Sequence, residues 1–182
     1  MDEEMRRSIE AFQNRPIFTA LDPQILAGIE DERLEQAIID FVVGRAEAQR
    51  VDEAEVLGSL NAAFSHVFAT WTVEAEVFNG GFNQYFFNSR GRLAEQAAAG
   101  YAAMGAPERE GIVREAMRRR AEHAPVLASA WSERTLEAFS ASYDLDVFEG
   151  LDPAFYALDG VEDASRLRIA YIRAHPDELT AG

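Results

Sequence analysis

The amino-acid sequence predicts an all-α fold, a single globular domain of six to eight helices around a long central helix. Apolar residues recur at steps of three and four along most of the chain, which is the helical period. No segment shows the alternating β-branched pattern that is typical of a strand. With 182 residues and 48% hydrophobic content, the chain can bury one core of ordinary size.

Net charge is the most unusual feature of the composition. The chain carries 32 acidic residues against 17 basic ones, all of them arginine, which gives a formal net charge of −15. This balance disfavours nucleic acid and anionic membranes as direct partners, and it favours basic protein surfaces or simple solubility. Cysteine is absent, which excludes disulfides, thiolate metal sites and cysteine nucleophiles.

We expect neither a targeting segment nor a membrane-spanning segment in this chain. Its N-terminus is acidic and lacks the apolar run of a signal peptide. No stretch approaches the ~18 uninterrupted apolar residues that a membrane-spanning helix needs. We therefore expect a cytoplasmic protein, and the lack of cysteine fits a reducing compartment.

Three helices are predicted in the first fifty residues. Asp2 can cap a helix that ends near Gln13, because Pro16 disfavours helical geometry in the residue before it. Asp22 and Pro23 are typical of a helix start and predict a short turn to Gly28. A longer helix should follow from an Asp31 cap to about Ala48, and one face of it is lined by Leu34, Ile38, Phe41, Val42 and Arg45.

The strongest helical pattern predicts the central helix. Asp52 is its expected cap, and it should run from about Glu53 to Gly80 and Gly81. Its apolar face comprises Leu57, Leu60, Phe64, Val67, Phe68, Trp71, Ala75 and Phe78.

Residues 73–88 form an unusual stretch, VEAEVFNGGFNQYFFN, that combines a glycine pair with amides and aromatic rings. The glycines can adopt positive φ at little steric cost, so they predict a sharp hinge between two packed helices. The rings of Phe82, Tyr85, Phe86 and Phe87 should fill a core, since each offers about 150–250 Å² of surface. The amides of Asn83, Gln84 and Asn88 must then find hydrogen-bond partners.

The remaining helices follow from turn residues and apolar spacing. Arg92 to Met104 and Pro107 to His123 read as two helices, and Pro125 is expected to terminate the second. Ser132 and Glu133 should begin another helix through Phe139. The segment from Asp144 to Gly160 looks irregular apart from a short turn begun by Asp152 and Pro153, and a final helix spans about Glu162 to His175.

The sequence lacks the common catalytic motifs. It has no HExxH, GxSxG or glycine-rich phosphate loop, and its three histidines are isolated from one another. His66, Thr70 and Glu74 do share a helical face, which could hold a metal or a proton-transfer pair, but structural roles are more common for such a set. We therefore predict a protein that is not an enzyme and that has no cofactor and no metal site.

Glu76 is the acid most closely associated with the hinge. Glu74 lies two positions away, and side chains two apart on a helix point in roughly opposite directions, so the two cannot easily share a site. Glu76 can instead accept hydrogen bonds from the amides of the hinge segment, a structural role.

Residues Glu76 to Gly91 read EVFNGGFNQYFFNSRG and resemble the signature of a small bacterial family described as DNA mimics. The similarity extends from about Val56 to Arg173. It implies an all-helical and dimeric domain whose acidic surface imitates DNA phosphates and occupies a helix-turn-helix regulator. The signature positions are Glu76, Asn79, Gly80, Gly81, Phe82, Gln84, Tyr85, Phe86, Asn88 and Gly91.

The resemblance also suggests a division of the chain. Residues 1–50 would be an N-terminal helical extension packed on the core, residues 51–176 the family-like domain, and residues 177–182 a C-terminal tail. The signature itself contributes few acids, so an acidic binding surface must come from elsewhere. The candidates are Glu30, Asp31, Glu32, Glu35, Asp52, Glu53, Glu55, Asp144, Asp146, Glu149, Asp152, Asp159, Glu162 and Asp163.

Two functions remain open at this point. The first is a non-enzymatic acidic protein that binds a basic protein, such as a DNA-binding regulator, and forms a homodimer. Acids one helical turn apart are separated by about 5–6 Å, so only two acidic rows could approach the phosphate spacing of DNA. The alternative is a helical module that holds a peptide or small ligand in a groove near Gly80 and Gly81, lined by Phe82, Tyr85, Phe86 and the neighbouring amides.

Overall fold

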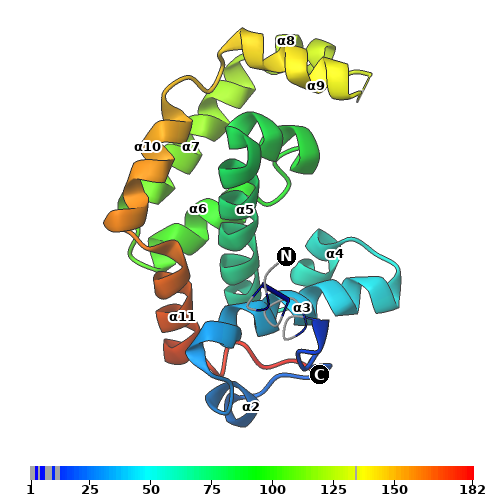
Figure 1. Cartoon of the computed structure of the whole chain (residues 1–182), viewed down its shortest axis with the longest axis vertical. Coiled ribbons are helices and arrows are strands. Elements are labelled where there is room, and N and C mark those ends of the chain that lie inside the picture. Colours follow the sequence, from blue (N-terminus) through cyan, green and yellow to red (C-terminus); the bar gives the residue numbers. More distant parts are fainter. Residues whose placement is uncertain (1–2, 4, 7–9, 11–12, 134) are drawn as a thin grey trace.

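The computed structural model describes residues 3, 5–6, 10, 13–133 and 135–182, and it confirms the all-α class. In this part of the chain, helices account for all the regular structure, and the only β pairing is an isolated bridge between Leu21 and Ala181. The helix expected from Asp2 to Gln13 falls largely outside the described residues. One helix runs through the centre of the molecule and the others pack around it (Figure 1).

The first two described helices are α2 (Pro23–Ala27) and α3 (Asp31–Gln49). As predicted, the Asp22 side chain caps α2 by accepting a hydrogen bond from the Ile25 N–H, at 2.7 Å. The prediction that Asp31 caps α3 is wrong, because Asp31 is already the first helical residue and its carboxylate binds Arg173 instead. The apolar face of α3 is buried as expected, with Leu34, Ile38, Phe41 and Val42 at 0–2% exposure.

The predicted central helix is in fact two helices, α4 (Glu53–Gly58) and α5 (Ala62–Ser89). Asp52 caps α4, and the Asn61 side chain starts α5 by accepting from the Ala63 N–H at 3.0 Å. The helical spacing of apolar residues continues across this break, so the spacing alone predicted one continuous helix. The predicted apolar face also differs near the middle of α5, where Ala75 and Phe78 are exposed.

Helix α5 forms the centre of the core. Its buried apolar residues meet α3 on one side and α6 (Ala94–Ala103) on the other. In Figure 1, α2, α3 and α4 lie at its lower end, and α6, α7 and α10 lie along one flank. Four residues in and beside α6, spaced at three and four positions, are all buried: Leu93, Ala97, Tyr101 and Met104.

The middle of the chain continues with α7 (Pro107–Glu122), α8 (Ala124–Ala130) and α9 (Leu136–Ser142). Pro107 opens α7 as predicted. Pro125 does not simply terminate a helix, because it lies in the first turn of α8, where a missing N–H costs no hydrogen bond. Helix α9 starts later than predicted, since Thr135 caps it by accepting from the Ala138 N–H.

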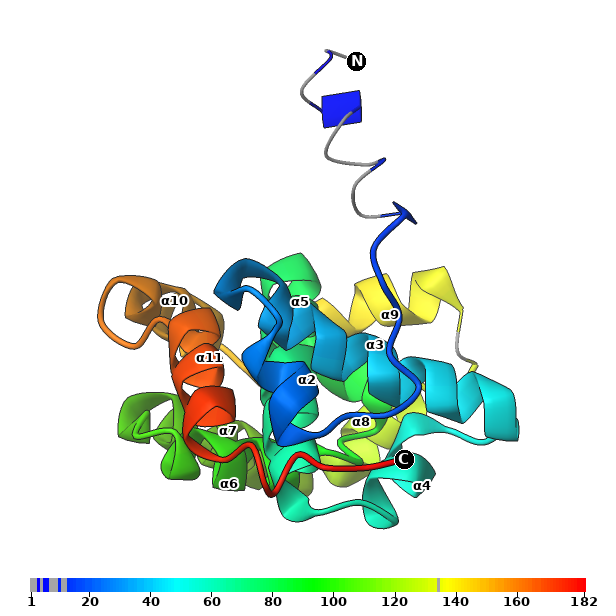
Figure 2. The ribbon, with the colours of Figure 1, turned by 90° about the horizontal axis from the view of Figure 1, so that it is seen from below.

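The segment expected to be irregular contains regular turns of helix. It comprises the 3₁₀ turn Tyr143–Leu145, α10 (Leu151–Tyr156) and the 3₁₀ turn Ala157–Gly160. The last helix, α11 (Ala164–Ala174), is capped by Asp163 and packs against α3 and α5. Beyond it, two backbone hydrogen bonds of 2.7 and 2.9 Å join Ala181 to Leu21, so the C-terminal segment runs beside the segment that precedes α2 (Figure 2).

Candidate protein-binding surface

The predicted hinge is a kink inside α5. Gly80 has an extended φ of −162°, and Gly81 has a φ of +71°, a conformation that favours glycine. A Cβ atom on Gly81 would also lie 2.2 Å from an Asp152 carboxylate oxygen. The backbone therefore requires glycine at position 81.

Three side chains from the segment between α9 and the end of α10 satisfy the kinked backbone. The Tyr156 hydroxyl donates to the Val77 carbonyl at 2.8 Å, and the Tyr143 hydroxyl donates to the Gly80 carbonyl at 2.6 Å. Asp152 accepts from the Phe82 N–H at 2.9 Å. Burial raises the pKa of Asp152, and the hydrogen bond from Phe82 only partly opposes this effect.

The amides of the hinge also have partners, as predicted. Gln84 and Asn88 both donate to one carboxylate oxygen of Glu76, each at 2.8 Å. Asn83 is buried and donates to the Ser142 hydroxyl at 2.8 Å. These contacts hold the two halves of α5 to each other and to α9, which is a structural role.

The prediction of a ligand groove beside the hinge, lined by its aromatic rings, is wrong. Phe82, Tyr85 and Phe86 are at most 1% exposed, so their rings fill the core and cannot line a groove. Phe82 packs edge-to-face on Phe155, and Phe86 stacks on Phe148 with a centroid distance of 5.3 Å. The cavity nearest the kink measures only about 120 Å³.

His66 and Glu74 do not contact each other, because each has a partner of its own. The His66 Nδ1 lies 2.9 Å from the Tyr171 hydroxyl, and burial lowers the pKa of His66. Glu74 forms an ion pair with Arg168, which is 1% exposed and also binds Glu35 at 2.6 Å. The two ion pairs link α3, α5 and α11.

Several of the fourteen candidate acids have structural roles inside the molecule. Glu162 was expected at the surface, but it is buried at 9% exposure and accepts from the N–H groups of Glu108 and Arg109 at 3.1 and 2.9 Å. It thus caps α7, whose first N–H groups need acceptors. The others with internal partners are Asp31 with Arg173, Glu35 with Arg168, Asp52 with Arg92, Asp152 with Phe82, Asp159 with Arg109, and Asp163 with the Arg166 N–H.

Seven candidate acids have neither an ion pair nor a side-chain hydrogen bond in the described part of the chain. They occupy three places: the start of α3, helix α4, and the segment between α9 and α10. In Figure 1, α9 lies at the upper end of the molecule, whereas α4 lies beside the lower half of α5. These seven, called here the free carboxylates, are Glu30, Glu32, Glu53, Glu55, Asp144, Asp146 and Glu149.

The arginines do little to balance this charge at the surface, because many of them bind acids within the chain. Arg118 and Arg119 of the arginine run in α7 both donate to Glu115, and these hydrogen bonds lower the Glu115 pKa to about 2. Arg120 lies over the Phe86 ring, 5.4 Å from its centroid. Two of the three arginines in this run are therefore paired with acids of the same helix.

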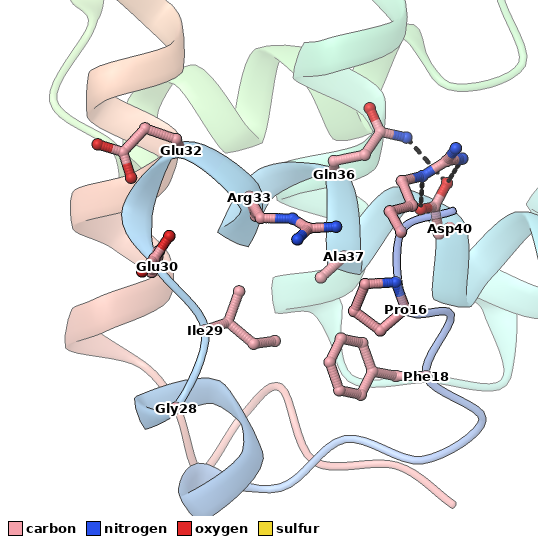
Figure 3. A pocket seen from close by; sticks show the side chains of 11 residues that line it. Pro16, Phe18, Gly28, Ile29, Glu30, Glu32, Arg33, Gln36, Ala37 and Asp40 are labelled. Atoms are coloured by element: carbon pink, nitrogen blue, oxygen red, sulfur yellow. Dashed lines mark hydrogen bonds and ion pairs between the residues drawn. The ribbon is translucent and has the colours of Figure 1, made fainter. Parts of the chain in front are cut away.

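A large cavity lies between the segment Arg15–Phe18, the turn after α2 and the first half of α3. Its volume is about 690 Å³. Figure 3 shows Pro16, Phe18, Ile29 and Ala37 around its apolar part. Glu30, Glu32, Arg33, Gln36 and Asp40 supply the polar part of its lining.

Sequence reasoning missed this cavity, because it depends on a long-range ion pair. Arg15 binds both carboxylate oxygens of Asp40, at 2.5 and 2.6 Å, and so holds the segment before α2 against α3. Burial would raise the pKa of Asp40, but the hydrogen bonds from Arg15 and Gln36 outweigh it and the pKa is lowered. No local motif marks such a pairing in advance.

A family model described as DMP19-like protein matches residues 58–175, well over half of the chain. The chain belongs to the DMP19-like family. Comparison with curated proteins and with solved structures found no match.

The DMP19-like match divides the free carboxylates into two sets. Asp144, Asp146 and Glu149 lie within the matched residues. Glu30, Glu32, Glu53 and Glu55 precede them, as does the whole lining of the large cavity. Among the described residues, no helix has the length and apolar character needed to cross a membrane.

Proposed function

We propose that this chain is a non-enzymatic binding protein that uses its free carboxylates to occupy a basic DNA-binding protein, such as a transcription regulator. The observation that carries the proposal is membership of the DMP19-like family. Residues Glu76 to Gly91 of this chain resemble the signature of DNA mimics. The net charge of −15 agrees with it, since an acidic surface attracts basic partners and repels DNA itself. The proposed setting is the cytoplasm.

The placement of the free carboxylates supports this function. Glu30 and Glu32 lie at one end of α3, and Glu53 and Glu55 lie just beyond the other end. The 19 residues of α3 span about 28 Å at ~1.5 Å per residue. That separation is of the same order as the roughly 34 Å between DNA half-sites read by a dimeric regulator.

A homodimer is part of the same proposal. Two copies related by a twofold axis would present each group of carboxylates twice, which suits a partner that is itself a symmetric dimer. Analytical ultracentrifugation at low and high salt should show a dimer that persists in both conditions. A monomer at all concentrations would remove this part of the proposal.

Competition with DNA tests the function. A regulator captured by the immobilised protein would be purified and its binding to fluorescent operator DNA followed by anisotropy. We expect this protein to displace the DNA competitively, so that more protein is needed as the DNA concentration rises. Formation of a ternary complex of regulator, DNA and this protein would contradict the proposal.

A matched pair of variants would assign the effect to the free carboxylates. Glu53→Gln with Glu55→Gln should weaken the competition several-fold, because each substitution removes one carboxylate facing the partner. The control, Glu108→Gln with Glu137→Gln, removes the same charge from other exposed positions and should have little effect. Equal losses in both variants would indicate attraction by net charge alone.

A further inference from the structure

The large cavity beside α3 has walls that are fixed before any ligand arrives. Arg15 and Asp40 hold one wall through two hydrogen bonds. Arg173 of α11 holds the opposite turn by donating to the carbonyls of Leu26 and Ile29 at 2.6 and 2.5 Å. A preformed cavity binds more tightly than one that must be ordered on binding, since less conformational entropy is lost.

The polar lining of this cavity is acidic overall, with three carboxylates against two guanidinium groups. Asp40 and Arg15 neutralise each other. Glu30 and Glu32 are both exposed and have no ion pair among the described residues. The remaining cation, Arg33, is exposed and lies across the cavity in Figure 3, where its apolar stem can cover a bound group.

We propose that this cavity is the docking site for one apolar side chain of the basic partner, next to an arginine or lysine that pairs with Glu30 and Glu32. The inference rests on the proposed function and specifies where the partner binds. The apolar part, formed by Phe18, Ile29 and Ala37, provides the hydrophobic contact. The carboxylates at the rim select a basic neighbour by charge complementarity. The cavity, at about 690 Å³, is large enough for a leucine or aromatic side chain with part of its backbone.

Three short peptides test this assignment with the intact, ¹⁵N-labelled protein. The probes are acetyl-Arg-Leu-Arg-amide, acetyl-Arg-Gly-Arg-amide and acetyl-Glu-Leu-Glu-amide, each titrated to millimolar concentration while amide chemical shifts are recorded. The leucine peptide with arginines should shift the amide signals of Ile29, Arg33 and Ala37. The affinity of the glycine peptide should be lower by at least about tenfold, because burial of one leucine side chain is lost.

The acidic peptide decides between two kinds of occupant. It should produce no shifts at the cavity, because Glu30 and Glu32 repel it. If it binds better than the basic peptide, Arg33 is the anchor and the proposal is overturned in favour of an apolar carboxylate ligand. Equal binding of the leucine and glycine peptides would also overturn it, since the cavity would then contribute nothing.

Two pairs of substitutions separate the cavity from general charge attraction. Glu30→Gln with Glu32→Gln should weaken the basic peptide several-fold, whereas Glu53→Gln with Glu55→Gln on α4 should leave it unchanged. Arg33→Gln should strengthen it, because a like charge is removed. Equal weakening by both pairs would refute docking at the cavity, yet DNA competition by the full protein would still support the proposed function. Peptide binding at the cavity without DNA competition would support docking at the cavity and contradict the proposed function.

Discussion

Single arginine residues connect helices that lie far apart in the sequence. Arg109 is fully buried, donates to the Glu162 carbonyl at 2.7 Å, and lies over the Phe155 ring at 4.5 Å. Arg168 and Arg173 bind acids that are more than 90 residues away. Several acids that the sequence offered as surface candidates therefore have partners inside the molecule. Only the folded structure distinguishes them from the free carboxylates.

Replacing Arg168 with methionine should destabilise the protein strongly. The substitution would leave Glu35 and Glu74 partly buried without their cation, and breaking such a pair typically costs about 3–5 kcal/mol. Urea denaturation followed by circular dichroism measures the change in free energy of unfolding. The control Arg166→Met, at an exposed position of the same helix, should change it by only about 0.5 kcal/mol. A loss below about 1 kcal/mol for the Arg168 variant would show that the two ion pairs contribute little.

Asp152 should make stability depend on pH. Its pKa is raised in the folded state, so the folded protein binds this proton more tightly than the unfolded chain. The resulting stabilisation is complete below the unfolded pKa of about 3.9 and is lost as the pH rises through the folded pKa. An asparagine side chain cannot titrate, so the stability of Asp152→Asn relative to wild type should increase between about pH 4.5 and about pH 7.5. Urea denaturation at both values measures this difference, and a decrease would show that the charged carboxylate is favourable at the kink.

Helix α5 shows how far local sequence could predict an element. The glycine pair predicted the kink, and the nearby amides predicted that Glu76 would accept hydrogen bonds, because both depend on residues close in sequence. The break before Asn61 was missed, since apolar spacing continues across it. The role of Pro125 was predicted wrongly, because proline is common both after the end of a helix and in the first turn of the next one.

Alanine substitutions at two glycines should have opposite effects. Gly81→Ala should destabilise the protein by about 1–3 kcal/mol, because Gly81 has a positive φ and its new Cβ would clash with Asp152. Gly44→Ala in the interior of α3 should stabilise by about 0.5–1 kcal/mol, since its Cβ would meet no atom within 4 Å. Thermal unfolding of both variants checks the signs. Full tolerance of alanine at position 81 would mean that the kink can straighten.

The candidate binding site was only partly predictable. Glu30, Glu32, Glu53 and Glu55 were chosen from charge alone, and the structure leaves them exposed or half-exposed and without an ion pair in its described residues. Glu162 was chosen in the same way and is buried, because the start of α7 needs its carboxylate. The large cavity could not be predicted, since its walls come from segments joined by Arg15 and Asp40 and by Arg173.

At the scale of the whole molecule, the family-matched residues and the N-terminal part contribute different features. Residues 58–175 contain the kink, most of the core and one group of free carboxylates. The preceding residues carry the other two groups and the cavity beside α3. We therefore expect the matched domain to provide the scaffold, while the N-terminal part determines which basic partner is bound.

The salt dependence of partner binding tests the central claim most directly. The affinity for the captured regulator would be measured by calorimetry between about 50 and about 300 mM salt, with wild type and with Glu30, Glu32, Glu53 and Glu55 all changed to Gln. If free carboxylates make the contact, affinity should fall steeply as salt rises, and the variant should show a shallower slope. Binding that is indifferent to salt, or an unchanged slope in the variant, would contradict the claim that this surface imitates DNA.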